Sequence, residues 1–182
     1  MVLLGGQGKH SKELEHLYYR IQNGFKAANV HTMRTRAAEL TKIAVNCYLT
    51  TKITYANQVG QVMIRDGMED EVKTVLKAIG GDSRIGTKYL NYGFGFGGPC
   101  FPRDNRAFAA YASKVGVETP LGVTTDKFND EHTEFLKEYF INKNKDNHAY
   151  VFHYLTYKDG VDILTESRPY DLALSLLDAG YE

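Results

Sequence analysis

The longest uninterrupted helical pattern in this chain runs from about Thr35 to Arg65, with no proline and no glycine before Gly60. Proline removes a helical hydrogen bond and glycine adds backbone entropy, so this stretch favours one long helix. Its apolar residues recur at helical spacing: Leu40, Ile43, Ala44, Cys47, Ile53, Ala56, Val59 and Met63. Because so long a helix needs tertiary partners, we expect it to pack against another long helix or to cross a domain junction.

Shorter helical patterns lie on both sides of this stretch. Their expected bounds are Lys12 to about Asn23, Glu69 to Ile79, Pro102 to about Lys114, Pro120 to about Asn142, and a last helix from about Pro169. Short β-type runs at Met1–Gly6, Phe25–Met33 and Ala149–Thr156 predict strands. We therefore predict a mainly α fold, in which a helical central domain with long helices is flanked by partial α/β pieces.

Both ends of the sequence carry incomplete βα patterns. Met1–Gly6 reads as a buried strand with no element before it, and Leu172–Glu182 reads as a helix followed by the first residues of a strand. A βα unit without its second strand buries its apolar face poorly. We therefore expect a fragment of a longer chain; the alternative is an unusual small domain.

The composition argues against several classes of function. Lys and Arg (22) balance Asp and Glu (22), so no net charge directs the chain to nucleic acid or to an anionic membrane. Two cysteines, no signal peptide and no long apolar run predict a cytoplasmic protein without disulfides. His132, His148 and His153 lack metal-ligand spacing to the cysteines, so we expect structural roles for them and no metal site.

The segment Tyr89–Asp104, YLNYGFGFGGPCFPRD, is the strongest candidate for a functional site. Its four glycines, Gly93, Gly95, Gly97 and Gly98, would let the backbone approach a ligand closely. Pro102 is typical of a helix start, which places Cys100 within a turn of a helix N-terminus, where a thiolate is favoured. The segment could therefore hold a substrate and attack it.

Two other interpretations of this segment stay open. Gly93, Gly95 and Gly98 fit the dinucleotide pattern G-x-G-x-x-G, although prolines flank them and no β-rich run leads in. The segment could also be a structural turn with a buried, inert cysteine.

A polar stripe at three- and four-residue spacing follows the long predicted helix: Glu39, Lys42, Asn46 and Thr50. One interpretation is a solvated helix face. The other is that Lys42 and Asn46, one turn apart, direct an ammonium and an amide at one developing negative charge.

Three separated stretches stand out together: AAELTKIAVNCYLTTKI (Ala37–Ile53), GGDSRIGTKYLNYGFGFGGPCFPRDN (Gly80–Asn105) and YKDGVDILTES (Tyr157–Ser167). In this order and at about this spacing, they resemble the UDP-glucose/GDP-mannose dehydrogenase family. The resemblance implies that residues 1–34 are the tail of an NAD-binding Rossmann domain. It further implies a central helical domain at 35–130, through which a homodimer forms, and the start of a nucleotide-sugar-binding α/β domain at 131–182.

The resemblance also implies an activity, the NAD-dependent oxidation of a nucleotide-sugar primary alcohol to the acid. Cys100 matches the nucleophile that carries a thiohemiacetal and then a thioester. Lys42 and Asn46 match the pair that stabilises the oxyanion, and Asp104 matches the carboxylate that orients Lys42 or the hydrolytic water.

Further matches imply binding roles. The residues matched to the loop around the substrate are Tyr89, Leu90, Asn91, Tyr92, Gly93 and Gly97. Arg84 matches an arginine that reaches the substrate of a neighbouring subunit, and Lys158 a lysine near the sugar nucleotide. Arg103 matches a basic residue near NAD.

Two positions depart from the family pattern. Thr165 stands where an arginine usually precedes Glu166, and Tyr154 stands where a glycine is usual. Both bear on which sugar nucleotide would be used, and the sequence does not name the sugar or the base. The alternatives are therefore a helical dimerisation module that is inactive by itself, and a homologue that binds a sugar nucleotide without oxidising it.

Overall fold

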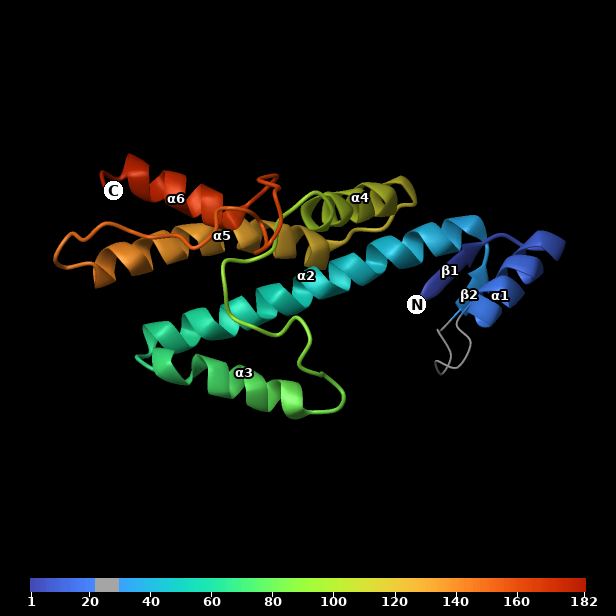
Figure 1. Cartoon of the computed structure of the whole chain (residues 1–182), viewed down its shortest axis with the longest axis horizontal. Helices are drawn as coiled ribbons and strands as arrows, with labels where there is room; N and C mark the ends of the chain where they lie inside the picture. The colour runs from blue at the N-terminus through green and yellow to red at the C-terminus, as the bar shows by residue number, and fades with distance from the viewer. Residues whose placement is uncertain (22–29) are drawn as a thin grey trace. The chain divides into compact units, whose positions relative to one another are not determined.

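The computed structural model describes residues 1–21 and 30–182, whose elements are shown in Figure 1. Its contacts divide the chain into two compact units, Met1–Val45 and Asn46–Glu182. The boundary falls inside helix α2 (Thr35–Arg65), whose bounds agree with the predicted long helix. The described chain is mainly helical, which confirms the predicted fold class.

The first unit contains a small parallel sheet. Strand β1 (Val2–Gly5) pairs with β2 (Val30–Met33), with Val2 opposite Val30 and Gly5 opposite Met33. Helix α1 (Lys9–Ile21) follows β1 and packs on both strands, as a connection between parallel strands requires. It begins three residues before the predicted start at Lys12; its predicted end near Asn23 and the predicted strand start at Phe25 lie outside the described residues.

The second unit has two apolar clusters. One joins α2 to α3 (Val72–Gly81), which follows a 3-10 turn, η1 (Glu69–Glu71). Its buried members are Ala56, Met63, Val72, Leu76 and Leu90. Apolar residues of α2 and α3 at helical spacing thus meet across the turn that Gly67 makes possible with φ +78.

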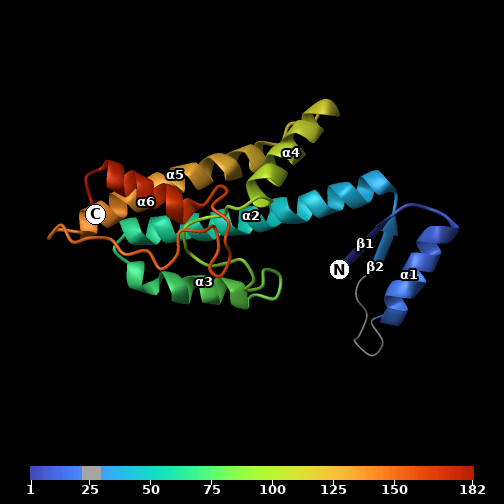
Figure 2. The same cartoon turned by 45° about the horizontal axis from the view of Figure 1, so that its top comes forward.

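The other cluster joins α5 (Pro120–Lys143) to α6 (Arg168–Asp178) through Leu136, Leu172 and Leu176. These two helices lie side by side in Figures 1 and 2, and α4 (Phe101–Lys114) packs on α5. Pro102 and Pro120 stand in the first turns of α4 and α5, where a missing N–H is tolerated. These helix starts are where the sequence predicted them, within one residue.

The predicted strand at Ala149–Thr156 is wrong for the described residues, which form no strand there. A strand needs a partner to fill its hydrogen-bonding groups. Here Tyr150 N donates to Glu182 O at 2.7 Å, while Tyr150 and Phe152 pack their rings against the α5–α6 cluster. The alternating apolar pattern therefore reflects packing on helices. No helix in the described ranges has the length and apolarity to cross a bilayer.

Candidate active site

A buried carboxylate joins α2 to the start of α4. Asp104 is only 3% exposed, and its Oδ2 accepts a hydrogen bond from Asn46 Nδ2 at 2.6 Å. Its Oδ1 accepts from Arg103 Nε and a terminal guanidinium nitrogen, at 3.1 and 3.0 Å. The bonds to Asp104 are the main reason that the pKa of Arg103 is raised, with a smaller contribution from the nearby Cys100. Both carboxylate oxygens are therefore satisfied, as a buried charge requires.

Cys100 is exposed and is the residue immediately before α4. The interpretation of this residue as a buried cysteine is therefore wrong. The helix N-terminus and the Arg103 guanidinium both place positive charge near its sulfur. Exposure together with positive surroundings is the setting in which nucleophilic cysteines occur.

The second half of the polar stripe on α2 faces the protein. Besides the bond from Asn46 to Asp104, Thr50 is fully buried and donates to Asn105 Oδ1 at 3.0 Å. The interpretation as a solvated face is therefore wrong for these two positions. Lys42 lies in the first unit, one helical turn before Asn46 on α2, and it is exposed.

A cleft of about 460 Å³ opens beside the glycine segment. Its lining residues are Ile53, Tyr89, Asn91, Tyr92, Gly93, Phe94, Gly95, Tyr154, Tyr157 and Pro169. Five of these are aromatic, and the rings of Phe94 and Tyr154 meet edge to face at 6.3 Å. Aromatic faces with a few polar groups suit the binding of a ring-shaped ligand such as a sugar or a base.

The cleft brings together four of the predicted substrate residues, Tyr89, Asn91, Tyr92 and Gly93. Leu90 instead lies in the α2–α3 core and is only 3% exposed.

Two of the other predicted binding residues outside the cleft, Lys158 and Arg84, are charged and exposed, whereas Gly97 is buried. Lys158 is exposed in the loop before α6. Arg84 pairs with Asp82 of its own turn at 2.6 Å.

The third of the family-like stretches, Tyr157–Ser167, is called the third motif below, and it lies against Gly97 and Gly98. A Cβ on Gly97 would overlap the carbonyl oxygen of Glu166, and one on Gly98 would overlap the ring of Tyr157. Gly98 N also donates to the carbonyl of Thr165 at 3.0 Å. Because Thr165 contributes its backbone to this contact, the contact does not depend on the side chain at that position.

Three buried polar side chains hold the backbone of the glycine segment, and the sequence did not single them out for this role. Asn57 Oδ1 accepts from Gly93 N at 2.9 Å, and His132 Nε2 bonds Gly93 O at 2.7 Å. Asn129 bonds both the N–H and the C=O of Phe96, at 2.9 and 2.8 Å. A usable signal was a polar residue on the apolar face of a predicted helix, such as Asn129 and His132 three residues apart on α5.

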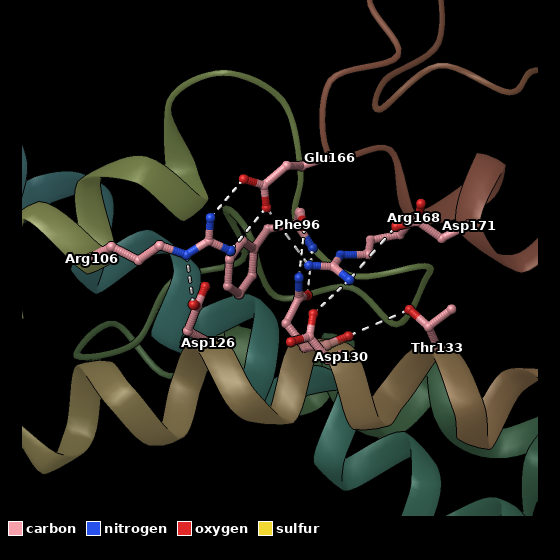
Figure 3. Close-up of polar contacts among 9 residues, drawn as sticks. Phe96, Arg106, Asp126, Asp130, Thr133, Glu166, Arg168 and Asp171 are labelled. Carbon is pink, nitrogen blue, oxygen red and sulfur yellow. Dashed lines mark hydrogen bonds and ion pairs between the residues drawn. The ribbon is translucent and has the colours of Figure 1, made fainter.

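A charged network ties the third motif to α4 and α5 (Figure 3). Arg106 of α4 bonds both carboxylate oxygens of Glu166, at 2.7 and 3.0 Å, and also bonds Asp126 of α5 at 3.0 Å. The bonds to Glu166 and then Asp126 raise the pKa of Arg106. Arg168 pairs with Asp130 of α5 at 2.7 Å. The loop that supplies Tyr154 and Tyr157 to the cleft is thus fastened at its C-terminal end.

Comparisons with known proteins identify relatives of this chain. Residues 36–131 match the model of the UDP-glucose/GDP-mannose dehydrogenase family, central domain. The chain is 35% identical to UDP-glucose 6-dehydrogenase of Haloferax volcanii, over 85% of this chain and 36% of that protein. It is 28% identical to GDP-mannose 6-dehydrogenase of Pseudomonas aeruginosa, over 100% of this chain and 40% of that protein.

A solved structure is similar as well. The UDP-glucose dehydrogenase of Pyrobaculum islandicum superposes with a TM-score of 0.82 at 29% identity, over 99% of this chain and 41% of that one. The chain therefore spans about two fifths of the length of these relatives.

Proposed function

Because this chain belongs to the UDP-glucose/GDP-mannose dehydrogenase family, we propose that it carries the nucleophile-bearing part of an NAD-dependent nucleotide-sugar 6-dehydrogenase. The observation that carries the proposal is the exposed Cys100 at the start of α4, one turn from the buried Asp104 that Asn46 holds. The substrate is a nucleotide sugar whose primary alcohol becomes a carboxylic acid.

The first oxidation converts the primary alcohol of the nucleotide sugar to an aldehyde, and Cys100 reacts with this aldehyde. The thiolate bonds to the aldehyde carbon and the carbonyl electron pair moves to oxygen, giving the anion of a thiohemiacetal. That carbon then loses its hydrogen as a hydride while the oxyanion re-forms the carbonyl, which gives a thioester. Water then adds to the thioester and the thiolate leaves, which releases the acid.

Asn46 and Lys42 stabilise the oxyanion in this proposal. The Asn46 amide has two hydrogens, and the bond to Asp104 uses one of them. Asp104 therefore orients the amide and leaves its second hydrogen for the substrate. Lys42, one turn earlier on α2, contributes positive charge.

NAD⁺, when bound, accepts the hydrides of both oxidations. Arg103 is the candidate contact for it in the second unit. Its side chain is 63% exposed although its guanidinium bonds Asp104, so it can also meet a phosphate oxygen. The cleft residues Tyr89, Asn91, Tyr92 and Gly93 would hold the sugar nucleotide, with Lys158 near its charged groups and Arg84 serving a neighbouring subunit.

The test replaces Cys100 by serine in the longest natural polypeptide that contains this sequence. The assay supplies UDP-glucose or GDP-mannose with NAD⁺ and measures NADH and acid. We expect acid formation to fall by about a thousandfold or more, because serine is a far weaker nucleophile. An unchanged circular dichroism spectrum is the control for folding, and full turnover by Cys100→Ser would contradict the role of Cys100.

A second candidate function is dimerisation through α2. Tyr48, Tyr55 and Val62 recur every seven residues on this helix and are 63%, 52% and 64% exposed. A stripe at this spacing fits a second copy of the same helix. Sedimentation of the chain should show a dimer that Tyr55→Glu dissociates; a monomer at all concentrations would count against it.

A further inference from the structure

His132 lies on α5 and is fully buried. Its ring stacks on Phe128 at 6.1 Å between centroids and on Phe135 at 6.2 Å, with interplanar angles of 10° and 13°. Burial lowers the pKa of this imidazole. The ring is therefore held in a fixed orientation among aromatic side chains and is favoured in its neutral form.

The hydrogen bonds of His132 fix its tautomer. Nε2 lies 2.7 Å from the carbonyl oxygen of Gly93, which can only accept, so Nε2 carries the proton and donates it. Nδ1 then has a free lone pair, and it accepts from Gln61 Nε2 of α2 at 2.8 Å. Both ring nitrogens of the neutral imidazole are thus satisfied.

These bonds reach the wall of the cleft. Gly93 lines the cleft, and its N–H is held by Asn57 while its C=O is held by His132. The neighbouring Tyr92, also in the wall, meets the His132 ring edge to face at 5.5 Å. The backbone and a side chain of the cleft wall therefore rest on one buried imidazole, which itself does not line the cleft.

We propose that His132 is a positioning residue for the nucleotide-sugar cleft: as a neutral imidazole bonded to Gln61 and Gly93, it holds the Tyr92–Gly93 wall in the conformation that binds the ligand. The assignment of the ligand rests on the proposed function, whereas the positioning of the wall does not. His132 acts through Gly93 and Tyr92 and takes no part in the chemistry at Cys100.

Protonation of His132 opposes this arrangement. A proton on Nδ1 would face the Gln61 amide nitrogen, which is a donor, so that bond would be lost. Around the ring, Tyr92 has its pKa raised by burial and stays neutral, and the guanidinium of Arg65 of α2 lies 5.1 Å from the Phe135 ring. The carboxylates in this region already have partners: Glu138 pairs with Arg65 at 3.0 Å and Glu131 pairs with Lys127 at 3.2 Å. An imidazolium would therefore gain little compensating negative charge, and the wall should loosen as pH falls.

The first test compares two substitutions in the 182-residue chain. His132→Gln places an amide donor where Nε2 stood and does not titrate, whereas His132→Phe keeps a stacked ring but removes both hydrogen bonds. Calorimetric titration with UDP-glucose, and separately with GDP-mannose, should give affinity within about threefold of the parent for Gln and about tenfold or more weaker for Phe. Affinity of His132→Phe equal to that of the parent would overturn the proposal.

The second test needs no ligand. Nitrogen NMR of the His132 ring should show the Nε2–H tautomer at neutral pH. The amide signals of Tyr92 and Gly93 should shift with the same midpoint as His132 in the parent, and this shift should be absent in His132→Gln.

An Nδ1–H tautomer, or wall signals that ignore His132, would reject the positioning role even if the phenylalanine variant does not fold. Conversely, wall signals that follow His132 in a chain that binds neither nucleotide sugar would support the positioning role and contradict only the assigned ligand.

Discussion

Two sets of contacts fasten the glycine segment and the third motif to the helices, and they differ in charge and burial. The neutral set consists of Asn57, Asn129 and His132, each between 0% and 2% exposed. The charged set consists of Arg106, Asp126, Glu166, Arg168 and Asp130 (Figure 3). Within it the side chain of Arg106 is 52% exposed, whereas that of Arg168 is only 10% exposed. Both sets include residues of α5: Asn129 and His132 belong to the neutral set, and Asp126 and Asp130 to the charged set.

The difference shows which set positions the backbone. A buried donor or acceptor that loses its partner bears the full desolvation cost, so the neutral contacts tolerate little movement. The ion pairs of the half-exposed Arg106 are screened by water and salt and adapt to small shifts, whereas those of Arg168 are screened less. We therefore expect the neutral set to fix the conformation of the glycine segment, while the pairs of Arg106 hold the loop before α6 less strictly.

The largest effect should follow from removal of a neutral contact. Asn129→Ala leaves the buried N–H and C=O of Phe96 without their partner, and Phe96 is only 2% exposed. The free energy of unfolding should fall by about 2–4 kcal/mol, measured by urea denaturation. Asn142→Ala, at an exposed position of the same helix, is the matched control and should change little; equal effects of the two would show that the neutral set has no special weight.

The next largest effect is on the pH dependence of the free energy of unfolding, which tests the neutral set without a substitution in the parent chain. Burial holds the pKa of His132 below its ordinary value of 6.5. At pH values between the lowered pKa and 6.5, the unfolded chain binds a proton at His132 that the folded chain does not. Stability is therefore fully present above pH 6.5 and falls as pH drops below it. The slope for one proton is at most about 1.4 kcal/mol per pH unit.

Urea denaturation at several pH values should show this loss in the parent and a smaller loss in His132→Gln. The five other histidines are present in both chains, so the difference isolates His132. Identical pH dependence in the two chains would place the titration elsewhere.

The sequence predicted those parts of the molecule that depend on local rules. The bounds of α2, and the starts of α4 and α5, follow from the placement of proline and glycine, and the cleft-lining Tyr89, Asn91, Tyr92 and Gly93 belong to the predicted glycine segment. The neutral set could not be found in this way. Its partners are backbone groups 33 to 39 positions away, and a buried asparagine carries no mark of which distant carbonyl it will meet.

The predicted strand at Ala149–Thr156 failed for a related reason. Its alternation of apolar residues is a local pattern, but a strand also requires a partner, which is a property of the surroundings. The polar stripe on α2 shows the same limit, because Asn46 and an exposed residue look alike in sequence until α4 is placed beside them.

A smaller effect is expected from the charged set. Arg106→Gln removes the bidentate pair with Glu166 and the bond to Asp126, and should lower the free energy of unfolding by about 1 kcal/mol, since half of the side chain is exposed. Arg106→Lys keeps the charge and should lose less. The effect of Arg106→Gln should shrink between low salt and 1 M salt; a loss as large as that of Asn129→Ala, unchanged by salt, would erase the distinction between the two sets.

The smallest effect sets the lower end of the comparison. Lys127 and Glu131 of α5 pair at 3.2 Å across one turn, with side chains 75% and 56% exposed. Glu131→Gln should change the free energy of unfolding by only a few tenths of a kcal/mol, about what an exposed pair at this spacing contributes to a helix. Because Glu131 precedes His132 directly, the substitution also asks whether nearby charge matters to the buried ring. If Glu131→Gln left stability almost unchanged yet shifted the pKa of His132, surface charge on α5 would affect the buried imidazole. His132 could then not be treated as independent of the charged groups around it.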